Sequence, residues 1–359
     1  MAKVELTSKE RFLRMFEHRE ADRVPMTDSP WGTTIERWRR EGLPTDADVA
    51  QYFGYDNIAS MFCDNSPRFP ARTVEETDEY VIATSPWGAT MKNWKHKTST
   101  PDFVGFTIVD RPSWAAAKER MTPTPDRIDW KYLETNYPKW IASGAWITAH
   151  GWFGYDVFAS WHSGTTRMLM AMLDDPDWCR EMFETSLDLQ IKLYDMAWAR
   201  GYRFDCFVFP DDLGYRNGLF FSPEVFRSVL KPVHKRAHDW AHNHGAVTMM
   251  HSCGNIMALI PDLIDAGLDA LNPFETKAGM NLLATKKLYG SELVLQGGID
   301  VRKMSKPGEI EDEIRTKVTA AKAGGGYVYH SDHSVPDDVS FADYKRVIRL
   351  VKKYGRYGA

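Results

Sequence analysis

Short apolar segments alternate with longer amphipathic segments over the second half of the chain. The apolar segments have the length and residue types of buried strands, and they comprise residues 146–150, 204–209, 247–250, 270–275, 292–300 and 326–333. The connecting segments have the helical period, as in residues 256–264, where isoleucine and leucine recur every three to four positions. Because each strand follows the last after a helix-length connection, the pattern predicts parallel strands joined by helical crossovers.

The number of predicted strands favours a barrel. Residues 24–28 have the pattern of a further strand, which makes seven, and we expect the eighth before residue 145. No Gly-x-Gly-x-x-Gly sequence follows the first strand, which argues against a dinucleotide-binding sheet. We therefore predict an α/β fold of the (β/α)8 TIM-barrel class.

The N-terminal part predicts an elaboration of this barrel and not a second domain. A capping box, Thr7-x-x-Glu10, opens a helix. Residues 79–84 and 89–94 have the alternating pattern of a β-hairpin. We predict one domain over residues 1–359, in which residues 51–113 belong to an N-terminal helical and β-hairpin elaboration.

Composition and charge argue against several classes of function. The net charge is -4 and the chain has no basic cluster, so we expect no nucleic-acid partner. No run of about 18 apolar residues is present, so we expect no membrane span. The four cysteines are scattered and the N-terminus has no apolar signal-peptide core, so we expect a protein of the reducing cytoplasm.

Polar residues that core packing does not explain fall at the carboxyl ends of the predicted strands. They are Asp28, His150, Asp211, Asp212, His251, Cys253, Glu275, Asp300, His330, Asp332 and His333. In a barrel these ends open onto one face, where the active site lies. A single strand-end carboxylate often only caps the next helix. Together, however, these residues have the composition of a metal site surrounded by acid–base groups.

His251 and Cys253 form the centre of the predicted site. Imidazole and thiolate are common zinc ligands, and a catalytic zinc usually has three protein ligands. The last strand offers the third, with His333 as our first candidate and Asp332 and His330 as alternatives, since all three lie on one turn. The simpler interpretation is that Cys253 is a small buried residue and His251 a satisfied strand-end side chain.

Other potential ligands have further interpretations. Asp211 or Asp212, from the preceding strand, could reach the metal or orient a histidine ligand. Three cysteines are expected to be structural: Cys63, Cys179 and Cys206. Three histidines share one face of a predicted helix, for which we favour a solvated face over a metal stripe: His234, His238 and His242.

With these residues in view, the chain resembles the uroporphyrinogen decarboxylase superfamily over almost its full length. Within it, the chain looks most similar to the branch of cobalamin-dependent methyltransferases, such as those that methylate coenzyme M. The matching elements are Arg23-Val-Pro25, Asp211-Asp-Leu-Gly214, Ser222-Pro-Glu224, Lys231-Pro232, Gly297-Gly-Ile-Asp300, Val335-Pro336 and, most specifically, His251-Ser-Cys-Gly-Asn255. In these methyltransferases a histidine and a cysteine at this spacing bind zinc, and the decarboxylase lacks the pair.

The chain departs from the family pattern in two places. The methyltransferases take a third ligand, a cysteine, from the end of the last strand, where this chain has Asp332 or His333. The decarboxylase carries an arginine-rich element after Arg-x-Pro, whereas residues 28–32 contain no arginine to pair substrate carboxylates. The second departure argues against uroporphyrinogen as the substrate.

The resemblance implies a zinc-dependent, corrinoid-linked methyltransferase. It would move a methyl group between a corrinoid (cobalamin) carried by a partner protein and a small compound. That compound is either methylated, of the methoxylated aromatic or methylamine type, or a thiol. The alternative is a decarboxylase or lyase acting on a small organic acid. A non-catalytic corrinoid- or tetrapyrrole-binding protein is a third hypothesis, and a homodimer stays open.

The remaining strand-end residues receive expected roles around the metal. We assign substrate orientation or proton transfer to Asp28, His150, Asp211 and Glu275. Aromatic residues near the strand ends would hold a flat substrate, with two carboxylates beside them: Trp31, Trp152, Phe153, Tyr155, Phe209, Asp212 and Asp300.

Overall fold

A curled sheet of parallel strands forms the centre of the structure, a computed structural model that describes residues 5–96 and 99–358. The strand order is β1-β6-β7-β10-β11-β12-β13, and every neighbouring pair is parallel. The strands are β1 Ile58–Met61, β6 Trp146–His150, β7 Cys206–Pro210, β10 Val247–His251, β11 Ala270–Asn272, β12 Val294–Gln296 and β13 Tyr327–Val328. The strands predicted from residue 146 onward are confirmed, and β1 is the strand expected before residue 145.

The strand predicted at residues 24–28 is an extended segment that pairs through isolated bridges. Met26 bridges Tyr329 in parallel, and the Thr27 N–H donates to the Tyr329 carbonyl at 3.0 Å. On its other side, the Asp56 N–H donates to the Met26 carbonyl at 2.8 Å, two residues before β1 begins. The extended segment therefore lies between the two edge strands of the sheet, β13 and β1.

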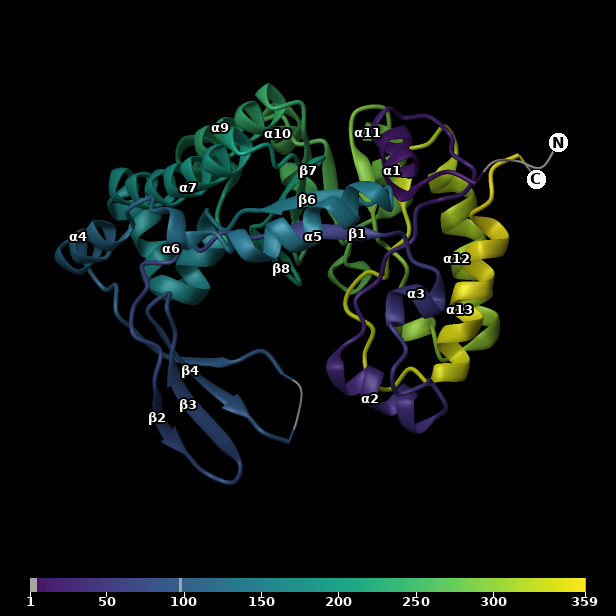
Figure 1. Cartoon of the computed structure of the whole chain (residues 1–359), viewed down its shortest axis with the longest axis horizontal. Coiled ribbons are helices and arrows are strands. Elements are labelled where there is room, and N and C mark those ends of the chain that lie inside the picture. The colour runs from purple at the N-terminus through teal and green to yellow at the C-terminus, as the bar shows by residue number, and fades with distance from the viewer. Residues whose placement is uncertain (1–4, 97–98, 359) are drawn as a thin grey trace.

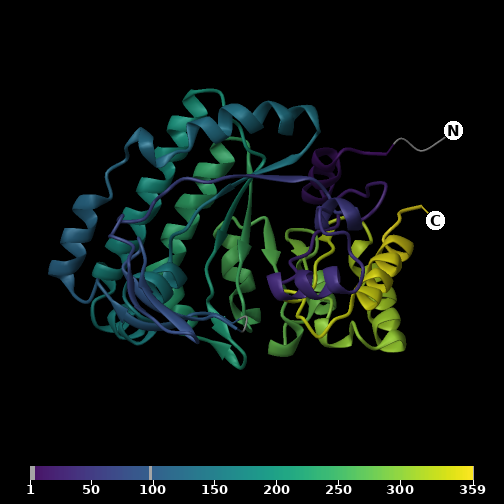
Figure 2. The same cartoon turned by 60° about the horizontal axis from the view of Figure 1, so that its bottom comes forward.

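Helices cover the outer side of the curled sheet, with α7 and α9 on one flank and α12 and α13 on the other (Figures 1 and 2). The helices are α1 Ser8–Phe16, α2 Gly32–Arg40, α3 Val49–Phe53, α4 Arg111–Arg120, α5 Trp130–Ala142, α6 Thr165–Asp174, α7 Pro176–Ala199, α8 Pro223–Val225, α9 Lys231–Asn243, α10 Ile260–Asp265, α11 Leu282–Tyr289, α12 Pro307–Lys322 and α13 Phe341–Tyr354. Within the described ranges, none of them has both the length and the apolarity that a membrane crossing requires.

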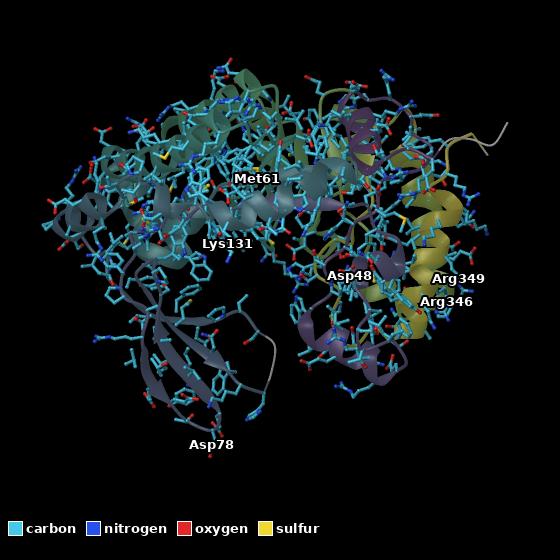
Figure 3. The ribbon with its side chains drawn as sticks, in the orientation of Figure 1. Asp48, Met61, Asp78, Lys131, Arg346 and Arg349 are labelled. Carbon is cyan, nitrogen blue, oxygen red and sulfur yellow. The ribbon has the colours of Figure 1, made fainter. Side chains whose placement is uncertain are left out.

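A four-stranded antiparallel sheet projects away from this body, with Asp78 at its far tip (Figure 3). Its strands are β2 Thr73–Glu76, β3 Tyr80–Thr84, β4 Ala89–Trp94 and β5 Asp102–Phe106. The predicted β-hairpin is confirmed as β3 and β4. The projecting sheet takes up only the middle of residues 51–113, since β1, from the same stretch, is a strand of the main sheet.

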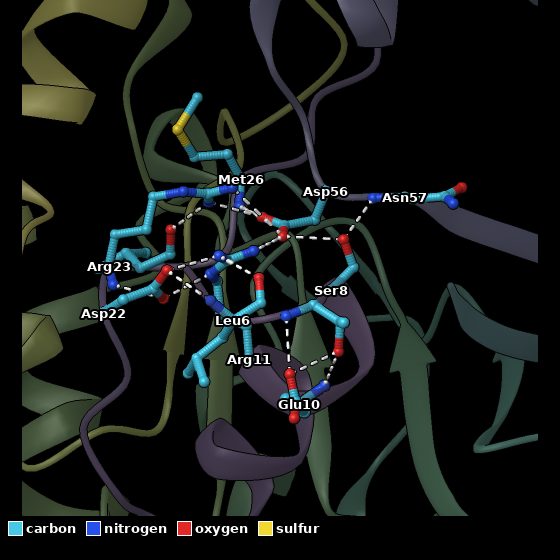
Figure 4. A network of polar contacts seen from close by, with 11 residues as sticks. Leu6, Ser8, Glu10, Arg11, Asp22, Arg23, Met26, Asp56 and Asn57 are labelled. Atoms are coloured by element: carbon cyan, nitrogen blue, oxygen red, sulfur yellow. Dashed lines mark hydrogen bonds and ion pairs between the residues drawn. The ribbon is translucent and has the colours of Figure 1, made fainter. Parts of the chain in front are cut away.

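A buried ion-pair network ties α1 to the start of β1 (Figure 4). The Arg11 side chain is 2% exposed and bonds Asp22 at 2.6 Å and also Asp56. Arg23 pairs with Asp56 at 2.7 Å, and Asp56 accepts the Met26 N–H at 2.7 Å. Arginine and aspartate therefore hold the extended segment beside the edge strand with their charges mutually satisfied.

Candidate metal centre

Two neighbouring strands bring together the residues of the candidate metal centre. β7 and β10 pair with Pro210 opposite His251, so the loops that follow the two strands lie side by side. Asp212 lies on the first loop and Cys253 on the second. One ligand atom each from Asp212, His251 and Cys253 lies within 4.8 Å of the others. The His251 Nε2 atom is 3.3 Å from Cys253 Sγ and 3.9 Å from Asp212 Oδ1.

Hydrogen bonds aim these groups at one another. Asn272 lies opposite His251 on β11, and its Oδ1 atom accepts the proton of His251 Nδ1 at 2.7 Å. The neutral imidazole then carries its lone pair on Nε2, the atom that faces Cys253. Asp212 Oδ1 accepts the backbone N–H of Cys253 at 2.7 Å. The tautomer of the histidine and the position of the carboxylate are therefore set before any ion binds.

Two glycines allow the two loops to approach so closely. Gly254 has a φ of +81°, and a Cβ atom there would lie 2.3 Å from the carbonyl carbon of Gly214. The Gly254 N–H donates to Glu275 at 2.7 Å, and the Asn255 N–H donates to the Tyr215 carbonyl at 2.9 Å. A side chain at residue 254 would push the Cys253 loop away from the Asp212 loop.

The surroundings of the group are rich in carboxylates. Burial raises the pKa of the Cys253 thiol, and the negative charges of Asp212 and Glu275 raise it further. Burial, followed by the charges of Asp212 and Asp211, raises the pKa of Asp156 to about 7. Neither Asp156 nor Asp212 pairs with a lysine or arginine among the described residues. This environment favours a bound cation, and a metal ligated by the thiol would deprotonate it.

The donor set fits a divalent metal of the zinc type. One imidazole nitrogen, one thiol sulfur and one carboxylate oxygen are all zinc ligands in proteins, and three protein ligands leave a further position for a substrate. Asp212, His251 and Cys253 would hold such an ion.

The last strand does not supply the third member of this group. His333 lies near it, where burial and the charge of Lys277 lower the pKa of the imidazole, but its assignment as a ligand stays a prediction. Each carboxylate oxygen of Asp332 accepts a backbone N–H, from Thr276 at 2.9 Å and from Val301 at 3.0 Å. Asp332 therefore fastens neighbouring loops together.

Two of the residues expected to orient substrate hold the loops of the site instead. The buried Asp211 points away from the metal group, since its Oδ2 lies 2.8 Å from His234 Nε2 and its Oδ1 accepts the Asp156 N–H at 2.7 Å. Glu275 binds Lys277 at 2.9 Å in addition to the Gly254 amide. Burial alone would raise the pKa of Glu275, but these two donors lower it overall.

His150, Asp28 and His330 face a different space, an internal cavity of about 260 Å³. Asp28 accepts hydrogen bonds from the hydroxyls of Tyr344 at 2.6 Å and Tyr329 at 3.1 Å. Burial lowers the pKa of His150 to about 4, so its imidazole is neutral at pH 7. The alternative ligand His330 therefore lies with the cavity residues and not with the metal group.

The predicted aromatic wall is largely part of the core, which corrects that expectation. Phe153 and Phe209 are fully buried and pack on each other with ring centroids 4.7 Å apart. Trp152 packs against Trp87 and Trp161 at the base of the projecting sheet. Tyr155 is 2% exposed.

Trp31 and Asp300 also have structural roles. Trp31 precedes α2, and its backbone N–H donates to the Val335 carbonyl at 3.2 Å. The buried Asp300 caps a short 3-10 helix and pairs with Arg302 at 2.7 Å. Their assignment as substrate-binding residues stays a prediction.

Sequence reasoning missed three residues near the site, which are Asp156, Asn272 and Phe62. Asp156 lies on the loop after β6. Asn272 orients His251, and its place as a polar residue at the end of an apolar strand was a signal that could have identified it. Phe62 is 61% exposed and stacks on His150 with ring centroids 4.6 Å apart. The prediction of a solvated helix face was wrong for His234 and His238, because both side chains are fully buried. His234 contacts Asp211. The three cysteines expected to be structural show no disulfide, and Cys179 and Cys206 are buried.

Comparison with known proteins places this geometry in a family. The sequence profile described as uroporphyrinogen decarboxylase (URO-D) matches residues 157–354, more than half of the chain. The methylcobamide:CoM methyltransferase MtaA of Methanosarcina barkeri is 32% identical over 104 residues, 29% of this chain and 29% of the relative, and MtaA of the Fusaro strain matches equally. The match therefore spans less than a third of these relatives' length.

The fold likeness extends over the whole chain. A solved structure, described as a methyltransferase from Methanosarcina mazei, superposes with a TM-score of 0.65 at 17% identity, over 98% of this chain and 99% of that one. All three residues of the metal group lie within residues 157–354, the part of the chain that the family profile matches. The chain belongs to the uroporphyrinogen decarboxylase family.

Proposed function

We propose that this protein is a zinc-dependent methyltransferase. It would move a methyl group between a corrinoid cofactor, carried by a separate partner protein, and a small methylated compound of the methoxylated aromatic or methylamine type, or a thiol. The observation that carries the proposal is the group Asp212, His251 and Cys253 at adjacent strand ends. The partial likeness to methylcobamide:CoM methyltransferases supports it.

We infer further that the curled sheet is a (β/α)8 barrel within one domain. The extended segment at residues 24–27 would be the eighth strand, since it bonds to Tyr329 beyond β13 and to Asp56 before β1. The projecting β2–β5 sheet would be an elaboration on the carboxyl-end side of this barrel. The metal group then lies on the face where barrel enzymes hold their active sites.

The residues of this chain would prepare the reaction in three ways. Zinc, when bound, would supply a Lewis acid that activates a thiol or polarises a methyl donor. Asn272 keeps His251 in the tautomer that presents Nε2. The Cys253 thiol gives up its proton on ligation. Asp156, with its pKa raised to about 7, can gain or lose a proton near neutral pH. It could therefore donate a proton to the leaving group or accept one from the attacking group.

Metal analysis of the purified protein tests the proposal. We expect about one equivalent of zinc per chain, and less than half an equivalent in His251→Ala, because two ligands bind zinc far less tightly than three. His242→Ala is the matched control, since His242 is a partly exposed histidine on α9 that pairs with Asp269. Less than half an equivalent in the unaltered protein, unchanged by His251→Ala, would contradict the zinc assignment.

Methyl transfer to or from free cobalamin separates the possible reactions. Demethylation of a methoxylated aromatic or methylamine by reduced cobalamin would support the donor version, and methylation of a thiol by methylcobalamin would support the acceptor version. Release of CO2 from small organic acids without methyl transfer would favour the decarboxylase instead. A zinc protein that performs neither methyl transfer would overturn the proposed activity.

A further inference from the structure

The curled sheet encloses a cavity, although the interior of a barrel of this kind is normally filled by side chains. Its volume is about 260 Å³, and every strand of the sheet contributes to its wall. At the strand starts, Phe12 and Phe16 stack on Trp146, with ring centroids 5.3 Å and 5.6 Å apart, and cover that end. Since a dry cavity of roughly 150 Å³ binds benzene, this one has room for a substituted ring.

The wall of the cavity has a polar arc and an apolar arc. The polar arc follows β6, β1, the extended segment, β13 and β12, with His150, Ser60, Ser29, His330 and Gln296. The apolar arc follows β7, β10 and β11. Its lining residues are Cys206, Val208, Met249 and Ala270.

The apolar arc lies directly below the metal group. Side chains two residues apart on a strand point to the same face. Met249, which lines the cavity, is therefore on the same face of β10 as His251. Val208 lies opposite Met249 on β7, two residues before the end of that strand. A ligand in the cavity thus has apolar walls on the side nearest the metal ligands.

The polar arc contains hydrogen-bond acceptors that are not used by the described residues. The Gln296 amide donates to Thr27 at 3.1 Å, and its Oε1 atom accepts no bond from a described residue. His330 Nδ1 donates to the Ser331 carbonyl at 2.6 Å, so the Ser29 hydroxyl donates to Nε2 at 3.1 Å and keeps its own lone pairs free. His150 Nε2 bonds Thr148 at 3.1 Å, which leaves Nδ1 without a partner in the described part of the chain.

The cavity contains no cationic partner for an anion. No lysine or arginine is among the described residues that line it. His150 is neutral, and the buried carboxylate of Asp28 already accepts several hydrogen bonds. Burying an unpaired carboxylate in such a space is costly, whereas a hydroxyl that donates to a free acceptor is accommodated.

We propose that this cavity binds a monocyclic methoxyphenol, with its hydroxyl donating to the polar arc and its methoxy group toward the metal group. The proposal rests on the proposed methyltransferase function for the direction of the methoxy group. The ring site itself stands on the volume, the two arcs and the free acceptors. It favours the methoxylated aromatic over the methylamine and thiol alternatives.

Calorimetric titration of the purified full-length protein with 2-methoxyphenol, without any corrinoid, tests the site. We expect saturable binding, and at least about tenfold weaker binding of 1,2-dimethoxybenzene and of 2-methoxybenzoate, because the first lacks the donor and the second carries a charge. Equal or tighter binding of either analogue would overturn the proposal. The absence of corrinoid prevents turnover, so binding is measured alone.

Two variants locate the bound ring. Ala270→Leu fills the cavity from β11 and should weaken binding of 2-methoxyphenol at least tenfold, whereas Ala142→Leu makes the same change at an exposed position of α5 and should leave it unchanged. Gln296→Leu removes an acceptor with little change of shape, so the preference for 2-methoxyphenol over 1,2-dimethoxybenzene should shrink. An unchanged affinity in a folded Ala270→Leu protein together with an unchanged preference in Gln296→Leu would place the ligand elsewhere.

Failure of this inference is distinguishable from failure of the proposed function. Zinc binding and methyl transfer without binding of 2-methoxyphenol in the cavity would overturn only the ring site. Binding in the cavity without zinc or methyl transfer would overturn only the methyltransferase assignment.

Discussion

Two clusters of carboxylates in the described part of the chain differ in whether they contain their own cations. At the edge of the sheet, Asp22 and Asp56 pair with Arg11 and Arg23. Burial raises the pKa of Asp22, but Arg11 outweighs that effect and lowers it overall. After β6 and β7, Asp156 and Asp212 have no lysine or arginine partner among the described residues.

The difference separates a cluster whose charges are paired within the chain from one whose carboxylates lack a lysine or arginine partner. A buried charge without a partner is costly, so a fold that keeps several carboxylates and a thiol together without arginine leaves room for a cation from solution. The edge cluster is complete within the chain. In the proposed function, a bound ion would complete the cluster at the strand ends, and this contrast yields four predictions.

The largest expected effect is on the edge cluster. Asp56→Asn removes the carboxylate that Arg11 and Arg23 share, so we expect the free energy of unfolding to fall by about 3–5 kcal/mol. Urea denaturation measures it. Asp126→Asn is the control, because Asp126 is exposed and pairs with Arg68, and its loss should cost less than about 1 kcal/mol. A loss in Asp56→Asn as small as that of the control would break the comparison.

The same substitution should act in the opposite sense at the metal group. Asp212→Asn keeps an oxygen for the Cys253 N–H but removes one negative charge. The zinc-free protein should be as stable as the unaltered one or slightly more stable, while zinc affinity should fall by more than about 100-fold, beyond the effect of losing an outer partner. Competition with a coloured chelator measures the affinity, and unaltered zinc binding would remove Asp212 from the site.

A smaller loss is expected when the partner of His251 is removed. Asn272→Ala deletes the acceptor of the Nδ1 proton, so the imidazole is no longer held in one tautomer. Zinc affinity should fall by about 10-fold, within the range for outer-shell partners. The exposed Asn136→Ala, on α5, should have no effect. An effect in Asn272→Ala as large as that of Asp212→Asn would mean that the amide itself is a ligand.

The smallest expected effect concerns pH. Asp156 has its pKa raised to about 7, so between roughly pH 4 and pH 7 the folded protein holds a proton that the unfolded chain has lost. The stability of the zinc-free protein should therefore fall as pH rises through this window, and Asp156→Asn should remove at least about 1 kcal/mol of that fall. Urea denaturation at pH 5 and pH 7.5 measures it, and identical slopes in both proteins would contradict the raised pKa.

Periodicity was sufficient for most of the fold. The strands after residue 145 are short apolar runs between helical segments, and the structure has a strand at each. The extended segment near Met26 was harder, because it pairs through single bridges whose partners lie some 300 residues away. The sequence analysis includes β1 in the elaboration. This strand has only four residues, and their pattern does not indicate that they pair with β6.

The sequence predicted which strand ends carry the candidate site, but not which loops come together there. His251 and Cys253 were found from spacing, because both lie on one strand and its loop. Asp212, one of two aspartates expected to reach the metal, lies with them, and His333 as the third ligand stays a prediction. Sequence spacing does not reveal which neighbouring loop bends toward a strand end. Asp332 shows a further limit, because a buried carboxylate that accepts two backbone N–H groups has the same sequence signature as a metal ligand.

The backbone contact between Gly214 and Gly254 has a consequence for the history of such proteins. It makes the three members of the metal group a local product of two adjacent strand–loop units, which Asn272 and Glu275 of the next unit support. A lineage could acquire or discard the metal by altering these two loops alone, while the rest of the scaffold and its ligand space are inherited intact. Metal-dependent and metal-free chemistries can therefore diverge on one ancestral frame by a few local substitutions.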